Sequence, residues 1–132
     1  MRLQALPYRF AVCKLNNMTG LNLNAPFFAL AKTDDEVSLI CPSEHTPQGC
    51  IAIEDGFCGF RVCGSLDFSL VGVLAKLTVP LAEEGISIVT FSTYDTDYLL
   101  VKEADYPRAV RVLTAAGYEW VNTLRSDTAA DT

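Results

Sequence analysis

The chain has 132 residues, of which half are hydrophobic and a fifth are charged, and its formal net charge is −6. This apolar content is enough for a core and excludes global disorder, and the length fits one compact domain or two small ones that share a core. The negative charge argues against nucleic acid, which demands Lys and Arg, and against anionic membrane surfaces. Because no apolar run has the length of a membrane span either, we expect no nucleic-acid and no membrane partner.

The start of the chain and the cysteines indicate the compartment. The first nine residues lack a long apolar segment, so we expect no secretory signal and a cytoplasmic location. Five cysteines, an odd number, fit reduced thiols. Most stand among apolar neighbours, as Cys13 and Cys41 do, and free cysteines are commonly buried. We therefore interpret them as small core residues.

The first half of the chain is predicted to be mostly strand and loop. Residues 8–15 form a strand pattern, and a loop rich in Asn and Gly follows. Residues 27–32 and 36–41 are two β-rich runs, with a hairpin turn at Thr33-Asp34-Asp35. Residues 42–57 are predicted to be mostly loop, with a short strand at 50–53. No clear helix is present, so this half lacks the helices of a complete α/β module.

The second half is more regular. A strand at 60–63 and a turn at 64–68 precede a helix at 69–84, where leucines recur at helical spacing. Gly85 ends this helix, because glycine tolerates a positive φ. After this helix we predict strands at 86–92 and 98–102, then a helix that Asp105 caps, and a last strand at 118–121.

The order in the second half is β-α-β-β-α-β, which is that of the ferredoxin-like split βαβ unit. We therefore expect an α+β fold made of tandem ferredoxin-like modules with antiparallel sheets, the first of them reduced. The expected divisions are a reduced N-terminal half at 1–57, a complete module at 58–123, and a flexible tail at 124–132, which is small and polar.

The segment 92–98, Ser-Thr-Tyr-Asp-Thr-Asp-Tyr, crowds hydroxyls and carboxylates between two apolar strands. A chain reversal needs only a Gly or an Asn. The surrounding stretch "CGSLDFSLVGVLAKLTVPLAEEGISIVTFSTYDTDYLLVKEADYPRAV", together with "FAVCKL" and "FFALAKTDDEVSLICP", resembles the ACT-domain family of amino-acid-binding regulatory modules, in particular its compact standalone tandem members. The same pattern is similar to the ligand-binding modules of a eukaryotic cytosolic arginine sensor.

This resemblance implies a ferredoxin-like fold, pairing of modules through sheet edges or helices, and a small effector held at the module interface. It implies a non-catalytic sensor that binds an amino acid or a similar zwitterion, without a cofactor, as a homodimer. Many members of the family are regulatory appendages of biosynthetic enzymes. We expect no catalytic domain attached to this chain, which leaves a regulated enzyme open.

The resemblance and the chemistry of a zwitterion both indicate two segments as the site. A ligand carboxylate fits the amides of a glycine-led turn before a helix, and an ammonium fits carboxylates and hydroxyls. The two segments need not lie at the same end of one module, so we expect an approach across a module interface. The candidate residues are Gly64, Ser65, Leu66, Asp67, Phe68, Ser92, Thr93, Asp95, Thr96 and Asp97.

Simpler interpretations remain open. Asp67 can cap a helix, and Thr93 and Asp95 can stabilise a hairpin through local bonds. The alternative function is a structural interaction module that pairs with a target enzyme and binds nothing small. A third interpretation is thiol or metal chemistry at the cysteines and His45, but the spacing lacks the tight pairs of a zinc site. We expect no metal site and no enzymatic activity.

Overall fold

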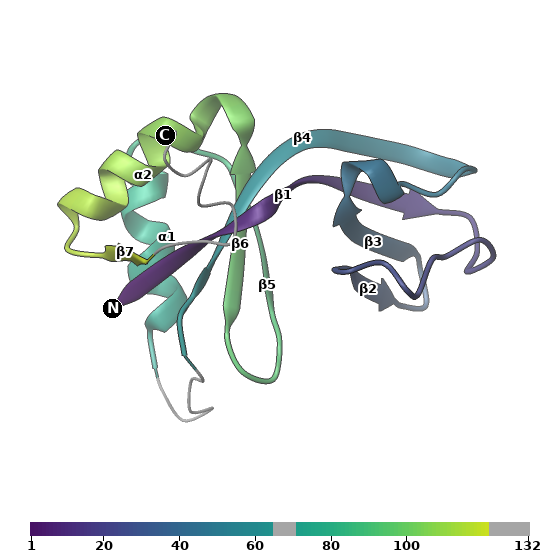
Figure 1. The fold of residues 1–132 in the computed structure, drawn as a ribbon, viewed down its shortest axis with the longest axis horizontal. Helices are drawn as coiled ribbons and strands as arrows, with labels where there is room; N and C mark the ends of the chain where they lie inside the picture. The colour runs from purple at the N-terminus through teal and green to yellow at the C-terminus, as the bar shows by residue number, and fades with distance from the viewer. Residues whose placement is uncertain (65–70, 122–132) are drawn as a thin grey trace. The chain divides into compact units, whose positions relative to one another are not determined.

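The computed structural model describes residues 1–64 and 71–121. By its contacts the chain divides into two units. The α/β unit comprises Met1–Pro7 and Cys58–Thr132, and the β unit comprises Tyr8–Phe57. Strands β1 (Arg2–Leu15) and β4 (Cys50–Val62) contribute residues to both units (Figure 1). The first residues of the chain therefore lie in the same unit as its second half.

The α/β unit has the predicted element order. The end of β4 is followed by α1 (Val73–Glu83), β5 (Ile88–Ser92), β6 (Asp97–Lys102), the 3-10 helix η2 (Glu103–Asp105), α2 (Tyr106–Ala115) and β7 (Glu119–Val121). The strand order in this unit is β5-β6-β4-β1-β7. The predicted ferredoxin-like α+β fold is confirmed.

The sheet of the α/β unit contains one strand that the sequence pattern did not predict. The start of β1 lies between β4 and β7 and pairs in parallel with β7, Arg2 opposite Glu119 and Gln4 opposite Val121. The expected strand began only at residue 8. Its first residues are held by a partner more than a hundred positions away, which a local pattern cannot reveal.

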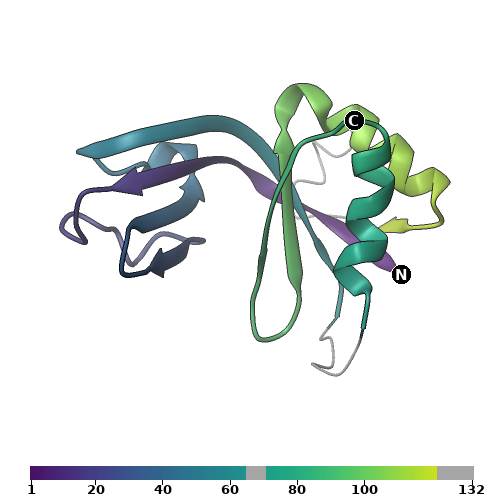
Figure 2. The same cartoon turned by 180° about the vertical axis from the view of Figure 1, so that it is seen from behind.

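Both helices cover the same face of this sheet. Alternate strand residues face one side, and the buried members at Phe60, Val62, Leu99 and Val101 lie in one cluster with the helical residues. The helices supply Leu77 and Leu81 from α1 and Ala109 and Leu113 from α2. Figures 1 and 2 show α1 and α2 on the same side of these strands. This core fixes the ends of β4 and β6.

The ends of α1 are set by two glycines. The helix begins at Val73, after Gly72 with a φ of 79°, which is later than the predicted start at 69. Residues 69 and 70 lie outside the described part of the chain. Gly85, with a φ of 71°, donates its N–H to the carbonyl of Ala82 and ends the helix as predicted.

The start of α2 differs from the predicted cap. Asp105 makes no side-chain cap hydrogen bond, and its carboxylate instead lies 3.4 Å from the Arg108 guanidinium. The physical reason is the preceding η2 helix, which gives Asp105 a φ of −92° and a ψ of −9°. A capping side chain usually projects from an extended backbone.

The β unit is a small sheet without a long helix. It contains β2 (Ala29–Lys32), β3 (Val37–Pro42) and the 3-10 helix η1 (Ser43–His45), and its strand order is β2-β3-β1-β4. Strand β4 runs unbroken through the region where only a short strand was predicted. The buried core consists of Ala11, Cys13, Leu15, Val37, Leu39 and Cys41.

The hairpin of the β unit recurs in the α/β unit. The run β2, turn, β3, η1 has the same order as β5, turn, β6, η2. Thr33 opens the first turn and Thr93 the second, sixty residues apart, and Ser43 and Glu103 open the two 3-10 helices with the same offset. The two hairpins are therefore equivalent positions in an internal repeat.

Candidate functional site

The turn between β5 and β6 is closed by its first threonine. Thr93 donates its backbone N–H to the carbonyl of Thr96 at 2.9 Å. The Thr93 hydroxyl donates to the same carbonyl at 3.3 Å and accepts the Thr96 N–H at 3.4 Å. All three of these bonds are local to the turn, so they match the simpler interpretation in which Thr93 stabilises the hairpin.

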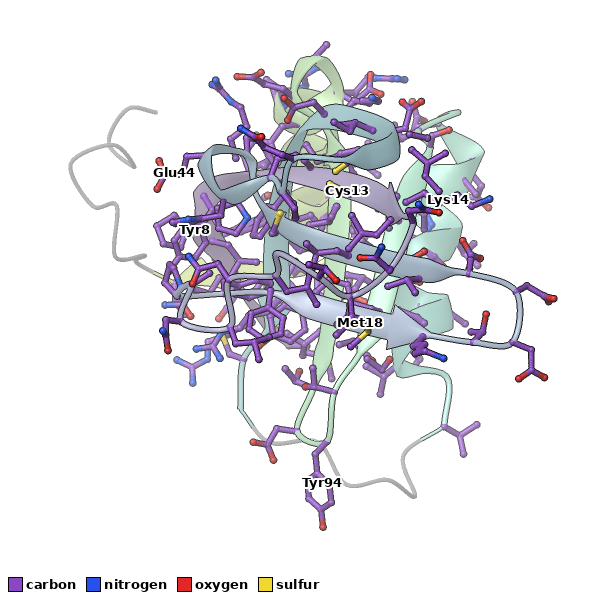
Figure 3. The ribbon with its side chains drawn as sticks, turned by 90° about the vertical axis from the view of Figure 1, so that its right-hand side faces the viewer. Tyr8, Cys13, Lys14, Met18, Glu44 and Tyr94 are labelled. Atoms are coloured by element: carbon purple, nitrogen blue, oxygen red, sulfur yellow. The ribbon has the colours of Figure 1, made fainter. Side chains whose placement is uncertain are left out.

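The flanking residues Ser92 and Asp97 bond to each other across the hairpin. The Ser92 hydroxyl donates to the Asp97 carboxylate at 2.5 Å, and these residues face each other in the β5–β6 register. At the tip, Asp95 is exposed, and Tyr94 is 80% exposed with its ring pointing away from the turn (Figure 3). Acidic groups of this segment therefore reach the surface of the unit.

Thr96 links the hairpin to the end of β4. Its side chain is only 5% exposed, and its hydroxyl donates to the carbonyl of Val62 at 2.8 Å. Val62 is the last residue of β4, and Gly64 follows two positions later. The hydrogen bond therefore ties the hairpin segment to the end of β4, two residues before Gly64, where the other predicted segment begins. Pattern reasoning allowed for these segments to face different modules and missed this contact.

Gly64 has the freedom that a close backbone approach requires. Its φ is 88°, and a Cβ built on it would meet no atom within 4 Å. The other predicted residues of this segment, Ser65 to Phe68, lie outside the described residues. The described part of the site thus consists of an open glycine, a buried threonine anchor and an acidic turn.

Two of the five thiols lie in the core of the β unit. All five cysteines are free of disulfides, and Cys13 and Cys41 are buried in the β unit. Burial raises the pKa of the Cys13 thiol to about 12, and the neighbouring Cys41 and Cys50 also raise it. Burial also raises the pKa of Cys41. A raised pKa disfavours the reactive thiolate, so these two groups have the chemistry of core residues.

The described part of the chain covers residues 1–64 and 71–121. Within these ranges no group of three or more His, Cys, Asp or Glu side chains is arranged to hold a metal ion. His45 is half-buried and lies 3.5 Å from the carboxylate of Glu44. Neither of the two α-helices described has the length and apolar character needed to cross a bilayer.

Comparison with known proteins shows which family this chain resembles. Residues 52–115 match the family described as ACT domain. A crystal structure of the protein Atu0741 from Agobacterium tumefaciens is similar over 91% of both chains, with a TM-score of 0.82 and 27% sequence identity.

Two further similarities agree with that match. The regulatory subunit of aspartate kinase from Thermus thermophilus, in its ligand-free form, covers 89% of this chain and 97% of its own, with a TM-score of 0.61. Its identity is 9%, so it supports the fold alone. The human protein CASTOR3P is 24% identical over an alignment 131 positions long, which covers 86% of this chain and 80% of the human one.

Proposed function

Residues 52–115 match the ACT-domain family, and from that premise we propose that the chain is a non-catalytic regulatory module that binds an amino acid. The aspartate kinase regulatory subunit, which shares the fold, is consistent with a role in controlling an enzyme. We propose that the ligand lies against the two segments that the sequence singled out, 64–68 and 92–97.

The observation that carries this proposal is the hydrogen bond from the Thr96 hydroxyl to the Val62 carbonyl, 2.8 Å long. It holds the acidic hairpin beside the strand end from which the glycine-led segment leaves. An amino acid needs donors and acceptors only a few ångströms apart, because its ammonium and its carboxylate are attached to the same carbon atom. The bond to Val62 supports such proximity between Gly64 and the acidic hairpin.

We assign the two ligand charges to different segments. The carboxylate would be bound by the segment that starts at Gly64 and leads to α1, whose first turn contains no acidic residue to repel an anion. The ammonium would be bound by Asp95, which is exposed, and by Asp97, which is half-buried. Ser92 would then keep the Asp97 carboxylate in place through the bond that it already makes.

A thermal-unfolding screen against the twenty amino acids tests the proposal. A ligand that binds only the folded state stabilises it by roughly 2.7 kcal/mol at a hundredfold excess over its Kd. We expect one or a few amino acids to raise Tm, and Asp95→Ala or Asp97→Ala to reduce that increase while the unliganded Tm changes little.

The matched control is Asp35→Ala, because Asp35 occupies in the first hairpin the position that Asp95 occupies in the second. This variant should keep the full response. If none of the twenty amino acids changes Tm at millimolar concentration, the alternative function gains support, namely a module that pairs with an enzyme and binds no small ligand.

We also propose that the chain acts in the cytoplasm and assembles as a homodimer, as paired modules of the family would. Five cysteines without a disulfide fit a reducing compartment. Sedimentation equilibrium should give twice the chain mass, and alkylation in intact cells should find the thiols reduced. A monomer at all concentrations, or oxidised thiols, would contradict these two statements.

A further inference from the structure

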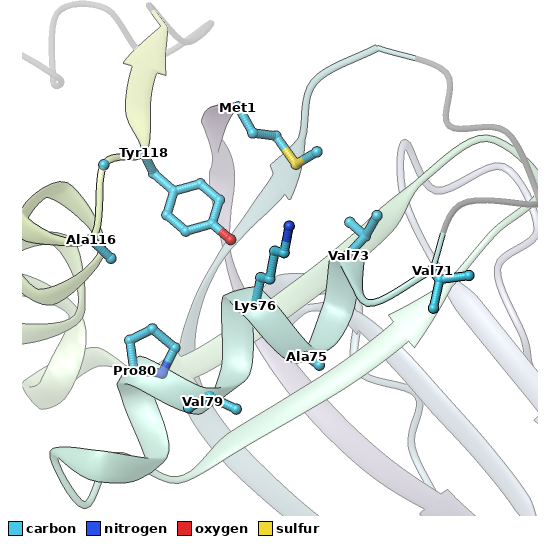
Figure 4. A pocket seen from close by; sticks show the side chains of 10 residues that line it. Met1, Val71, Val73, Ala75, Lys76, Val79, Pro80, Ala116 and Tyr118 are labelled. Atoms are coloured by element: carbon cyan, nitrogen blue, oxygen red, sulfur yellow. The ribbon is translucent and has the colours of Figure 1, made fainter.

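A concave surface lies on the helical side of the α/β unit, between α1 and the segment that leads into β7. This groove has a cavity volume of about 770 Å³, within the range of roughly 300–1,000 Å³ that small-molecule sites occupy. The residues that line it include Val73, Lys76, Val79, Pro80, Ala116 and Tyr118 (Figure 4). Most of them are apolar, so the groove favours an apolar ligand body.

The charge of the groove is opposite to that of the chain. The sequence contains 16 acidic and 10 basic residues, yet Lys76 is the one charged side chain among the described residues that line the groove. Figure 4 shows the Lys76 ammonium and the Tyr118 hydroxyl pointing into the same space from two different elements. The groove therefore combines an apolar wall with two hydrogen-bond donors.

Both donors lack a partner for their side chains within residues 1–64 and 71–121. No hydrogen bond or ion pair joins the Lys76 ammonium or the Tyr118 hydroxyl to that part of the chain. Burial raises the pKa of Tyr118, which keeps its hydroxyl protonated and able to donate. Small residues beside them leave the space open, since a Cβ on Gly117 would meet no atom within 4 Å.

From this arrangement we propose that the groove binds a small molecule with an apolar body and a single anionic head group, of the class of aliphatic or aromatic monocarboxylates. The head group would accept hydrogen bonds from Lys76 and Tyr118, and the body would lie against Val73, Val79 and Pro80. No acidic side chain lines the groove among the described residues, so a free amino acid would leave its ammonium without a carboxylate partner. The described residues of the proposed zwitterion site, Gly64 and 92–97, do not line this groove.

The test is a titration of the full ¹⁵N-labelled chain with sodium octanoate, followed by ¹H–¹⁵N spectra, with octanamide as the uncharged probe of equal length. We expect octanoate to shift the amides of Lys76, Gly117 and Tyr118 at lower concentration than octanamide does. Lys76→Met keeps the apolar stem and should weaken octanoate about fivefold, the magnitude of a solvent-exposed charge pair. Tyr118→Phe should weaken it roughly threefold.

The matched control is Lys14→Met, since Lys14 is exposed in the β unit, outside the groove. It should bind octanoate like the wild type. Equal affinity for octanoate and octanamide, or an unchanged affinity in Lys76→Met, would overturn the proposal. Two other occupants would also overturn it: a second copy, seen as self-association that Lys76→Met abolishes, or residues 122–132, seen as nuclear Overhauser contacts from that segment to Tyr118. Failure here leaves the amino-acid screen unaffected, because its variants lie elsewhere.

Discussion

The two β-hairpins of the chain share a turn and differ in the residues that complete it. Thr33 and Thr93 each donate a backbone N–H to the carbonyl three residues further on, at 2.9 Å in both hairpins. In the β unit the last turn residue is the exposed Glu36, whereas in the α/β unit it is the buried Thr96. The bond that closes the turn is therefore common to both hairpins, and the buried Thr96 distinguishes the second one.

The next position shows the same contrast. Val37 is buried and belongs to the core of the β unit, whereas Asp97 is half-buried and accepts a hydrogen bond from Ser92. An apolar contact in one hairpin is thus replaced by a polar pair in the other. Because burial of a valine side chain stabilises a fold, the second hairpin forgoes that apolar contribution at this position, which is consistent with the proposed binding role of Asp97.

The cores of the two units also differ, because buried thiols occur only in the β unit among the described residues. The largest predicted effect is a loss of folding stability at alkaline pH. The pKa of Cys13 is raised from 9.0 to about 12 in the folded state, so the folded chain keeps a proton that the unfolded chain releases. The stability from this protonated thiol is complete below pH 9 and is lost as the pH rises through about 12.

Urea unfolding at pH 8 and pH 11 measures this effect. Cys13→Ala should lower the free energy of unfolding at both pH values, because it removes buried volume. The decrease in that free energy from pH 8 to pH 11 should, however, be smaller in Cys13→Ala than in the wild type. Cys63→Ala, in the other unit, is the control and should retain the wild-type difference. An equal loss in Cys13→Ala and wild type would contradict the buried thiol as a source of alkaline sensitivity.

Thr96→Val sharpens the hairpin comparison. The substitution leaves the carbonyl of Val62 without its hydroxyl donor, and an unsatisfied buried group costs about 1–3 kcal/mol. Glu36→Val, at the equivalent turn position of the β unit, should change stability by less than about 0.5 kcal/mol. Denaturant unfolding measures both. Equal losses of stability in Thr96→Val and Glu36→Val would contradict a stabilising role that is particular to the buried Thr96.

The smallest effect is expected where the hairpins agree. Thr33→Val and Thr93→Val each remove the turn hydroxyl, which makes local bonds in both hairpins. Each should cost about 0.5–1 kcal/mol by thermal unfolding, the usual net contribution of an exposed hydrogen bond. A cost several times larger for one of the two would break the equivalence of the turns.

Much of the fold could be predicted from local patterns, and the exceptions have identifiable causes. Gly85 ended α1 as predicted, because a positive φ is a local property. Strand β4 was predicted in two pieces because Glu54, Asp55 and Gly56 interrupt its apolar pattern. The start of β1 was missed because its pairing partner is β7. Strand pairing over long distances decides these boundaries, and a local window does not contain it.

For the candidate site, the sequence indicated the residue types and the family but not their geometry. The cluster at 92–97 was visible because it exceeds the needs of a turn. The role of Thr96 depends on a hydrogen bond to a residue 34 positions earlier, which no spacing rule supplies. The groove at Lys76 was not predicted at all, since its residues come from α1 and from the approach to β7, far apart in the chain.

The most direct test of the account is a map of amide shifts when the best amino acid of the thermal screen is added to the full ¹⁵N-labelled chain. The account predicts that shifts gather at residues 62–64 and 92–97, and that the equivalent hairpin at 33–37 stays unchanged. Shifts of equal size in both hairpins, or shifts confined to residues outside 62–68 and 92–97, would contradict it.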